Sequence, residues 1–331
     1  MSLNKRILVT GGAGYIGSNT TLRLLDAGYD VVVADNLSRG NRDAVDPGRL
    51  RIVDLLDTDS LIRVMRERPC DAVIHFAAFI AVGESMQVPE IYFHNNTAGS
   101  LSLLTAMLKA GVKKIVFSST AAVYGMPERV PIPETEPRAP VNAYGESKVM
   151  VETLLEWFDR IHGIRSVCLR YFNASGADPR CRAGEDHEPE THLIPLLFRA
   201  IQTGKPVTLF GDDYATPDGT CIRDYIHVTD LAQAHVAAVE ALSDGGPSRK
   251  YNVGTGSGYS VKEVLGAVEK VTGKPVPYVM GPRREGDPPA LVADSTRLQS
   301  ELGWKPEYSD LDTIVRTAWN WANRERAQAA T

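Results

Sequence analysis

Short apolar runs alternate with longer amphipathic segments through the first half of the chain. The runs are rich in valine and isoleucine and lack the polar–apolar alternation of a half-exposed strand. Such runs are typical of strands in a parallel sheet that is covered on both faces. They occupy residues 6–10, 30–35, 50–54, 71–78, 113–119 and 165–172. Between them, helical character is found in 17–27, 58–67, 89–110 and 143–162.

This order of elements predicts an α/β fold with a Rossmann-like doubly wound parallel sheet. After about residue 173 the rhythm breaks, and a polar, turn-rich loop is followed by shorter elements separated by proline and glycine. We expect a smaller mixed α/β C-terminal lobe there. The predicted division is one domain over 1–174 and a second over 175–331, with segments of about 224–254 returning to the first.

Charge and cysteine content limit the kinds of binding partner and the cellular compartment that we expect. The formal net charge of −5 gives no electrostatic reason to expect nucleic acid or an anionic membrane surface as a partner. No apolar run approaches the roughly 20 residues that span a bilayer. The four cysteines form no C-x-x-C pair, which is typical of reduced thiols rather than of a disulfide framework or a zinc site. These features predict a cytoplasmic protein.

A glycine-rich turn follows the first predicted strand. In "GGAGYIG", Gly11, Gly14 and Gly17 are spaced three residues apart between the strand and a helix. Glycine permits a tight turn and a close approach of the backbone to a pyrophosphate, which then faces the free N–H groups of the helix. The pattern in this context predicts a dinucleotide cofactor.

The ends of the next strands refine this prediction. Asp35 lies 18 residues after Gly17, where a carboxylate accepts a hydrogen bond from the ribose 2′-hydroxyl and repels a 2′-phosphate. This favours NAD over NADP, although Arg39 lies close enough in sequence to leave NADP open. Asp54 ends the third strand, where it has two roles open to it: contact with the adenine edge, or capping of the following helix.

A tyrosine and a lysine share one helical face further along. Tyr144 and Lys148 are four residues apart, about one helical turn. The preceding strand ends with hydroxyl side chains, Ser118 and Thr120, at the sheet edge that carries the glycine turn. A nearby ammonium and an oxidised nicotinamide would lower the pKa of a phenol, which then exchanges a proton with a substrate hydroxyl. We therefore predict an acid/base pair.

The segment "EDHEPETH" offers a competing hypothesis of a metal site. It places His187 and His192 among acidic residues. The spacing fits no common zinc pattern, and runs of this kind are mostly solvated loops. The sequence therefore predicts no metal.

These motifs together resemble a known family. "GGAGYIG", "FSSTAAVYG" and "YGESK" are similar to the extended short-chain dehydrogenases/reductases. "VIHFAAFIAVGES", "RYFNASGA", "DGTCIRDYIHVTDLAQAH" and "PRREGDPPALVADS" resemble its UDP-glucose 4-epimerase branch, across nearly the whole chain. The resemblance implies an NAD-binding first domain and a nucleotide-sugar-binding second domain. It also implies interconversion of UDP-galactose and UDP-glucose through a transient 4-keto sugar, and a homodimer formed by the helices at 89–110 and 143–162.

The resemblance also implies roles for particular residues. The catalytic residues would be Thr120, Tyr144 and Lys148, with Tyr144 as acid/base. Residues that would contact NAD are Gly11, Gly14, Tyr15, Ile16, Gly17, Asp35, Asn36, Asp54, Leu55, Phe76, Ala77, Ala78, Asn95, Ser118, Tyr144, Lys148 and Tyr171. Residues that would contact the UDP-sugar are Thr120, Asn173, His192, Leu193, Phe210, Arg223, Tyr225, Arg284, Asp287 and Leu291. For Phe210 and Tyr225, plain core packing is the alternative.

Three positions depart from the family pattern. Thr120 stands where many members have serine, and it keeps the hydroxyl. Ile80 replaces a lysine that lies near the cofactor in some members, so we expect no cofactor contact there. Leu291 replaces a bulky tyrosine of the sugar pocket, and this predicts that N-acetylated UDP-sugars are also accepted.

Alternative functions differ from the predicted one in single features of the sequence or the pocket. A sugar dehydratase needs acidic residues after Thr120, where this chain has Ala121 and Ala122. Epimerisation of UDP-glucuronate or UDP-xylose stays open, because sequence does not fix the geometry of a sugar pocket. A non-catalytic NAD(H)-sensing protein stays as an alternative of another class, although such proteins typically lose the tyrosine or the lysine.

Overall fold

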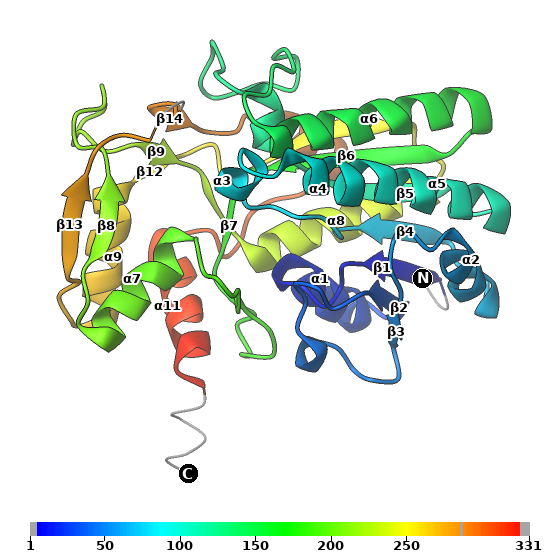
Figure 1. The fold of residues 1–331 in the computed structure, drawn as a ribbon, viewed down its shortest axis with the longest axis horizontal. Coiled ribbons are helices and arrows are strands. Elements are labelled where there is room, and N and C mark those ends of the chain that lie inside the picture. The colour runs from blue at the N-terminus through cyan, green and yellow to red at the C-terminus, as the bar shows by residue number, and fades with distance from the viewer. Residues whose placement is uncertain (1–4, 285–286, 325–331) are drawn as a thin grey trace.

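A seven-stranded parallel sheet forms the centre of the protein (Figure 1). The computed structural model describes residues 5–284 and 287–324. The strand order is β11-β6-β5-β4-β1-β2-β3, and all neighbouring strands run parallel. The strands are β1 (Arg6–Thr10), β2 (Asp30–Asp35), β3 (Leu50–Ile52), β4 (Ala72–His75), β5 (Lys114–Thr120), β6 (Arg165–Tyr171) and β11 (Arg249–Val253). This arrangement confirms the predicted Rossmann-like fold.

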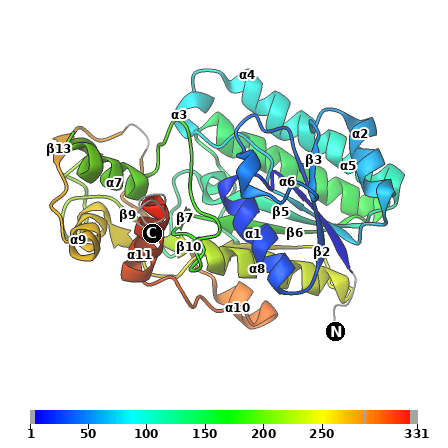
Figure 2. The same cartoon turned by 90° about the horizontal axis from the view of Figure 1, so that it is seen from below.

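Helices cover both faces of this sheet, as Figure 2 shows from a second direction. Leu24 and Leu231 belong to the core of one face, whereas Leu61, Leu103 and Val151 belong to the core of the other. The first face carries α1 (Tyr15–Asp26), α8 (Val228–Ser243) and α10 (Thr296–Leu302). The second carries α2 (Thr58–Glu67), α5 (Gly99–Ala110) and α6 (Ala143–His162). Burial on both faces explains why the strands lack a polar side.

Two predicted elements differ in detail. The strand predicted over 71–78 ends at His75, because the amides of Phe76 and Ala77 turn to the Thr10 carbonyl. The helix predicted over 89–110 is α4 (Pro89–Tyr92), a π-helical stretch η2 (Phe93–Ala98) and α5 in succession. Such π turns within helices are frequent at functional sites.

The C-terminal lobe has a core of its own, built by Leu197, Val264 and Ile314. Its helices are α7 (Leu193–Thr203), α9 (Val261–Thr272) and α11 (Leu311–Ala322). Small sheets complete it: β8 (Val207–Phe210) with β13 (Tyr278–Gly281), β7 (Asn173–Ser175) with β10 (Tyr225–His227), and β9 (Ile222–Arg223) between β12 (Tyr259–Ser260) and β14 (Ala290–Leu291). Single turns occur at η1 (Arg42–Ala44), α3 (Val82–Ser85) and η3 (Ala121–Tyr124).

The chain returns to the large sheet after entering this lobe. Strand β11 pairs with β6, and α8 packs against β5, β6 and α1. The segment 224–254 therefore contributes a helix and a strand to the central layer, while β10 pairs with β7 outside it. Within the described residues, each helix is too short or too polar to span a bilayer.

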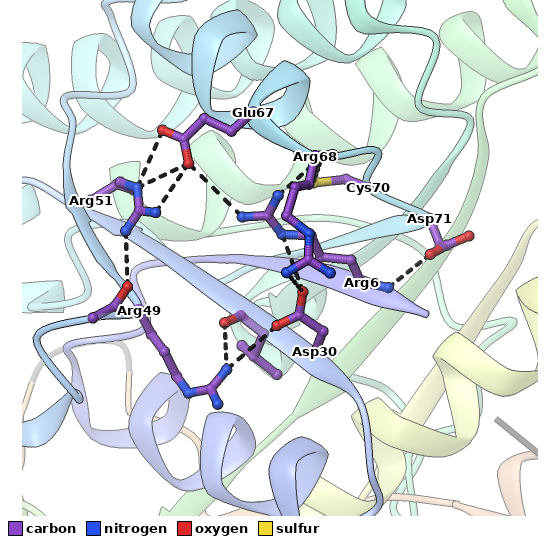
Figure 3. A network of polar contacts seen from close by, with 10 residues as sticks. Arg6, Asp30, Arg49, Arg51, Glu67, Arg68, Cys70 and Asp71 are labelled. Atoms are coloured by element: carbon purple, nitrogen blue, oxygen red, sulfur yellow. Dashed lines mark hydrogen bonds and ion pairs between the residues drawn. The ribbon is translucent and has the colours of Figure 1, made fainter. Parts of the chain in front are cut away.

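Ion pairs gather at the amino ends of the strands (Figure 3). Asp30, the first residue of β2, lies 3.0 Å from Arg68 and 3.5 Å from Arg49. Glu67 lies 3.0 Å from Arg51. These side chains line a cavity of about 500 Å³. Exposed pairs of this kind contribute about 0–1 kcal/mol each. Ligands of such sheets bind at the opposite, carboxyl edge.

Candidate active site

The glycine turn lies at that carboxyl edge, between β1 and α1. Gly11 has a φ of +71°, and a Cβ there would lie 2.4 Å from the Ala77 amide nitrogen. A Cβ on Gly17 would lie 2.2 Å from the Gly11 carbonyl oxygen. Gly14 is the N-cap of α1 and offers no side chain to the first N–H groups of that helix. The turn therefore presents uncapped amides and a positive helix end, which fit a pyrophosphate.

Asp35 holds this turn in place. Its Oδ2 accepts a hydrogen bond from the Ala13 amide at 3.0 Å, and its Oδ1 accepts one from the Leu37 amide at 2.9 Å. A carboxylate oxygen accepts more than one hydrogen bond, so the predicted contact with a ribose hydroxyl is still available. Arg39 was the cation that kept NADP as an alternative cofactor. It forms an ion pair with Glu84 at 2.9 Å.

Asp54 does not cap helix α2. The N-cap is Asp57, which accepts a hydrogen bond from the Ser60 amide, so the capping alternative for Asp54 is wrong. The helix begins at Thr58, and Asp54 lies too far upstream to reach its first turn. Instead, Asp54 accepts a 2.9 Å hydrogen bond from the Asn36 side chain. Asn36 and Asp54, both predicted to contact NAD, thus lie together.

Three residues on β5 and α6 form the predicted catalytic group. Thr120 is the last residue of β5, and Tyr144 and Lys148 lie in the first two turns of α6. Asn142 caps this helix by accepting a 2.8 Å hydrogen bond from the Gly145 amide. The Thr120 hydroxyl lies close enough to the Tyr144 phenol to lower the pKa of that phenol. The structure therefore brings the three side chains together in a buried setting.

Lys148 is an unusually placed ammonium. Its side chain is buried, and Nζ donates a 3.0 Å hydrogen bond to the Ser118 carbonyl. Within the described residues it has no carboxylate partner, and burial lowers its pKa to about 7. Nζ lies 5.9 Å from the centre of the Tyr144 ring. An ammonium with hydrogens to spare fits the hydroxyls of a nicotinamide ribose.

The pKa of Tyr144 is raised in the protein alone. Burial raises it, and the Thr120 hydroxyl only partly offsets this effect. In the protein alone the net shift is upward, so the phenol holds its proton at neutral pH. The lowered pKa predicted for this phenol requires the positive charge of an oxidised nicotinamide in addition to the ammonium.

The other predicted cofactor residues line the same edge. Ser118 and Tyr171 share a hydrogen bond of 2.6 Å between their hydroxyl oxygens. Asn95 lies on the π turn η2, where it donates to Asn96. Tyr15 donates from its phenol to the Gly176 carbonyl at 2.6 Å. Ile16 and Phe76 pack against one sheet core, and Leu55 and Ala77 belong to the other. Ala78 follows β4 with Phe76 and Ala77.

Two predicted phosphate-binding arginines lie in the C-terminal lobe. Arg223 on β9 pairs with Asp287, and the Arg284 guanidinium lies 4.3 Å from the centre of the Phe210 ring. Leu291 on β14 stands opposite Arg223 in register and packs against the cluster around Val123, just after Thr120. The predicted sugar residue thus packs against the cluster that includes the segment following Thr120. Glu285 and Gly286 of the same motif lie outside the described residues.

The remaining predicted substrate residues lie in different environments. Asn173 on β7 and Tyr225 on β10 are register partners. Tyr225 is buried within the core of the C-terminal lobe, which favours the packing alternative for it. Leu193 begins α7. The His192 ring is turned to Glu185 in the preceding loop.

Comparison with known proteins identifies the family. A model of the NAD dependent epimerase/dehydratase family matches residues 7–254. The chain belongs to this family. It is 52% identical over 317 residues to the UDP-glucose 4-epimerase of Lacticaseibacillus casei, covering 95% of this chain and 96% of the relative. The crystal structure of UDP-glucose 4-epimerase from Brucella ovis in complex with NAD is 48% identical, with a TM-score of 0.93 over 96% of this chain and 98% of that one. The enzyme from Bifidobacterium longum, in complex with NAD+ and UDP, is 41% identical with a TM-score of 0.91, covering 97% and 99%.

In this member of the epimerase/dehydratase family, a buried network behind the site escaped prediction. Arg170 on β6 forms two hydrogen bonds with the carboxylate of Glu152 on α6, and the Arg170 and Glu152 side chains are 2% and 0% exposed. Glu152 also accepts a 2.7 Å hydrogen bond from Ser119, and Arg170 donates one to Tyr124. One feature of the sequence could have pointed to Glu152. It lies four residues after Lys148, on the helical face that also carries Tyr144.

Proposed function

We propose that this family member is a UDP-glucose 4-epimerase that keeps NAD bound and interconverts UDP-galactose and UDP-glucose. The observation that carries the proposal is the buried group of Thr120, Tyr144 and Lys148 at the sheet edge that also carries the glycine turn. The relatives named above bear this activity in their names and match the chain over nearly its full length.

The chain's residues would divide the work as follows. Bound NAD supplies a hydride acceptor for C4 of the sugar and a donor for its return on the opposite face. The positive charge of bound NAD would lower the pKa of Tyr144, and the phenolate would then take the proton of the sugar 4-hydroxyl and later return it, with Thr120 holding the same oxygen. Lys148 binds the ribose next to the nicotinamide. The uncapped start of α1 binds the pyrophosphate.

The substrate end would be held by charge. Arg223 and Arg284 would bind the diphosphate of UDP, since a planar guanidinium matches the geometry of phosphate oxygens. Arg223 is already paired with Asp287, and a diphosphate would compete with or share this partner. Between this end and Tyr144 the transient 4-keto sugar has to rotate, so tight contacts are expected at the nucleotide rather than at the sugar.

The size of the residue at position 291 sets the sugar range in this proposal. Leu291 packs beside η3, the segment that follows Thr120. Leucine occupies less volume than tyrosine, so room would be left for an N-acetyl group. We therefore propose UDP-GlcNAc and UDP-GalNAc as additional substrates.

A homodimer is part of the same proposal. Large apolar side chains are exposed on α5 and α6: Leu101, Met150, Trp157 and Ile161. Exposed apolar patches on neighbouring helices are typical of an interaction surface. We propose that two copies pair through these helices, and that the protein is cytoplasmic, which agrees with its four free cysteines.

The proposal is tested by incubating purified protein with UDP-galactose and following UDP-glucose by NMR. Conversion without added NAD would support both the reaction and the retained cofactor. Absence of conversion of UDP-galactose, even after NAD is supplied, would refute the proposed substrate pair.

A further inference from the structure

Four potential metal ligands converge in the loop between β7 and α7. One ligand atom each from Glu185, His187, Glu190 and His192 lies within 4.8 Å of the others. His187 Nδ1 is 3.1 Å from Glu185 Oε1, and His192 Nδ1 is hydrogen bonded to the same oxygen. His192 Nδ1 is also 3.8 Å from Glu190 Oε1. Two imidazoles and two carboxylates therefore point to one place.

The two carboxylates of this group are buried. The side chains of Glu185 and Glu190 are 8% and 5% exposed. In the described part of the chain their ion-pair partners are His187 and His192, with no lysine or arginine among them. Two buried carboxylates need compensating positive charge, because the cost of desolvating them is several kcal/mol per ion. A divalent cation between the four groups would supply it.

Packing fixes the backbone that carries these ligands. The Trp321 indole donates a 2.9 Å hydrogen bond to the Glu185 carbonyl. A Cβ on Gly184 would lie 2.4 Å from the Trp321 ring, so this turn is pressed against α11. On the other side the Tyr15 and His187 rings meet edge to face, with centroids 6.1 Å apart. The group is therefore held between the start of α1 and the C-terminal lobe.

We propose that Glu185, His187, Glu190 and His192 bind one divalent transition-metal ion, for which zinc is the best match. Tetrahedral zinc takes imidazole nitrogen and carboxylate oxygen at about 2.0–2.2 Å, which places neighbouring ligand atoms roughly 3.4 Å apart. The separations of 3.1 Å (His187–Glu185) and 3.8 Å (His192–Glu190) lie on either side of this value. The His192–Glu185 pair is closer and the whole set spreads over up to 4.8 Å, so the side chains have to shift to close around the ion. Two nitrogen donors disfavour Mg²⁺ and Ca²⁺, which prefer oxygen alone.

The ion would act as a brace rather than as a catalyst. His192 is the N-cap residue of α7, and Leu193 is its first residue. Tyr15, the neighbour of His187, follows the glycine turn and is hydrogen bonded to Gly176 at the start of the loop. A metal bond at His187 and His192 would therefore tie the loop to the start of α7, beside the helix that begins at the cofactor turn.

The alternative that needs no metal is a cluster of protonated imidazoles. Two imidazolium ions would neutralise the same carboxylates. The two states differ in a measurable way, because the first holds one metal ion per chain and the second holds none.

The test uses the full chain, without a histidine tag, purified in chelator-free buffer. Metal content is measured by plasma mass spectrometry before and after one equivalent of Zn²⁺ is added and excess is removed. We expect one zinc ion per chain and, on replacing it with Co²⁺, the visible absorption bands of a tetrahedral site. Wild-type protein that retains no stoichiometric zinc and gives no such Co²⁺ bands overturns the proposal.

Variants locate the ion. His187→Gln should weaken Zn²⁺ binding at least about 100-fold, because it removes one ligand outright. His162→Gln is the matched control, since His162 is exposed at the end of α6, and it should bind as the wild type does. Equal zinc binding by His187→Gln and wild type would contradict the assignment. Circular dichroism establishes that each variant is folded, and none of the readouts depends on epimerase activity.

Discussion

Lys148 Nζ lies 3.0 Å from the carbonyl oxygen of Ser118, so the second turn of α6 is tied to the end of β5. This contact places a buried ammonium at the carboxyl edge, where none of the carboxylates in the described part of the chain pairs with it. The cost of such burial lowers the pKa of Lys148 to about 7. A bound ligand with hydroxyl oxygens would relieve part of that cost.

Lys148→Met should therefore release the cofactor. We expect the purified variant to contain at least about tenfold less NAD per chain than the wild type, as measured by chromatography of the denatured protein's supernatant. Lys113→Met, which alters an exposed lysine bonded to the His162 carbonyl, is the control and should retain NAD. Full NAD occupancy in Lys148→Met would show that the ammonium does not bind the ribose.

Tyr144→Phe should abolish turnover while leaving NAD in place. The substitution removes one oxygen, and general acid/base catalysis is worth roughly 10²–10⁴-fold in kcat. The exposed Tyr278, changed to Phe, should have no effect. Steady-state rates with UDP-galactose measure both. A Tyr144→Phe enzyme with wild-type kcat would exclude the phenol as the proton carrier.

Glu152→Gln should lower stability in a pH-dependent way. Burial raises the pKa of Glu152, but bonding and charge from Arg170 outweigh it, so the net shift is downward. A carboxyl with a lowered folded-state pKa stabilises the fold fully above its unfolded value of about 4.3 and loses this contribution as pH falls through the folded value. At pH 7 the free energy of unfolding of the variant should be about 3–5 kcal/mol lower than that of the wild type, because Arg170 is left buried and unpaired.

The difference between Glu152→Gln and wild type should shrink as the pH falls below about 4. Urea titrations at several pH values measure it. Glu156→Gln, one turn further along α6, alters a largely exposed glutamate and should cost about 0–1 kcal/mol. A constant Glu152→Gln effect down to the lowest pH at which the fold survives would contradict this assignment.

Leu291→Tyr should narrow the sugar range. A larger ring beside η3 would exclude an N-acetyl group, so kcat/KM for UDP-GalNAc should fall at least about tenfold while that for UDP-galactose changes little. Leu291→Met conserves volume and should keep both activities. If wild type turns over UDP-galactose but not UDP-GalNAc, the proposed breadth is wrong.

Trp157→Glu should separate the proposed dimer. Trp157 is 53% exposed on α6, and a charge at the centre of an apolar interface should weaken association at least about 30-fold. Light scattering during gel filtration reports the mass. Tyr278→Glu places a charge on an exposed aromatic of the C-terminal lobe and should leave the mass unchanged. A monomeric wild type would refute the dimer.

The central sheet was predictable because its signals are local. The valine-rich runs at 6–10 and 30–35 and the helix at 143–162 end where the sequence changes character, and the structure confirms them to the residue. Spacing along one helix likewise placed Tyr144 and Lys148 together. Such features depend on continuous apolar runs and on the 3.6-residue period of a helix, both of which a sequence displays directly.

Contacts that depend on how the chain folds back were not predictable. Arg170 reaches Glu152 from a strand that follows the helix, and no sequence spacing encodes that approach. The π turn around Asn95 breaks a run that reads as regular helix. The loop at 185–192 gathers two histidines on one carboxylate because its backbone turns back on itself, and this turn leaves no periodic signal.

The most direct test of the account uses UDP-galactose carrying deuterium at C4 and purified protein with no added NAD. Proton and deuterium NMR follow the product. We predict UDP-glucose that keeps its deuterium at C4, because the label would leave and return within one closed site while Tyr144 exchanges only the hydroxyl proton. Failure to form UDP-glucose with or without added NAD, or loss of the label to solvent, would contradict the proposed mechanism.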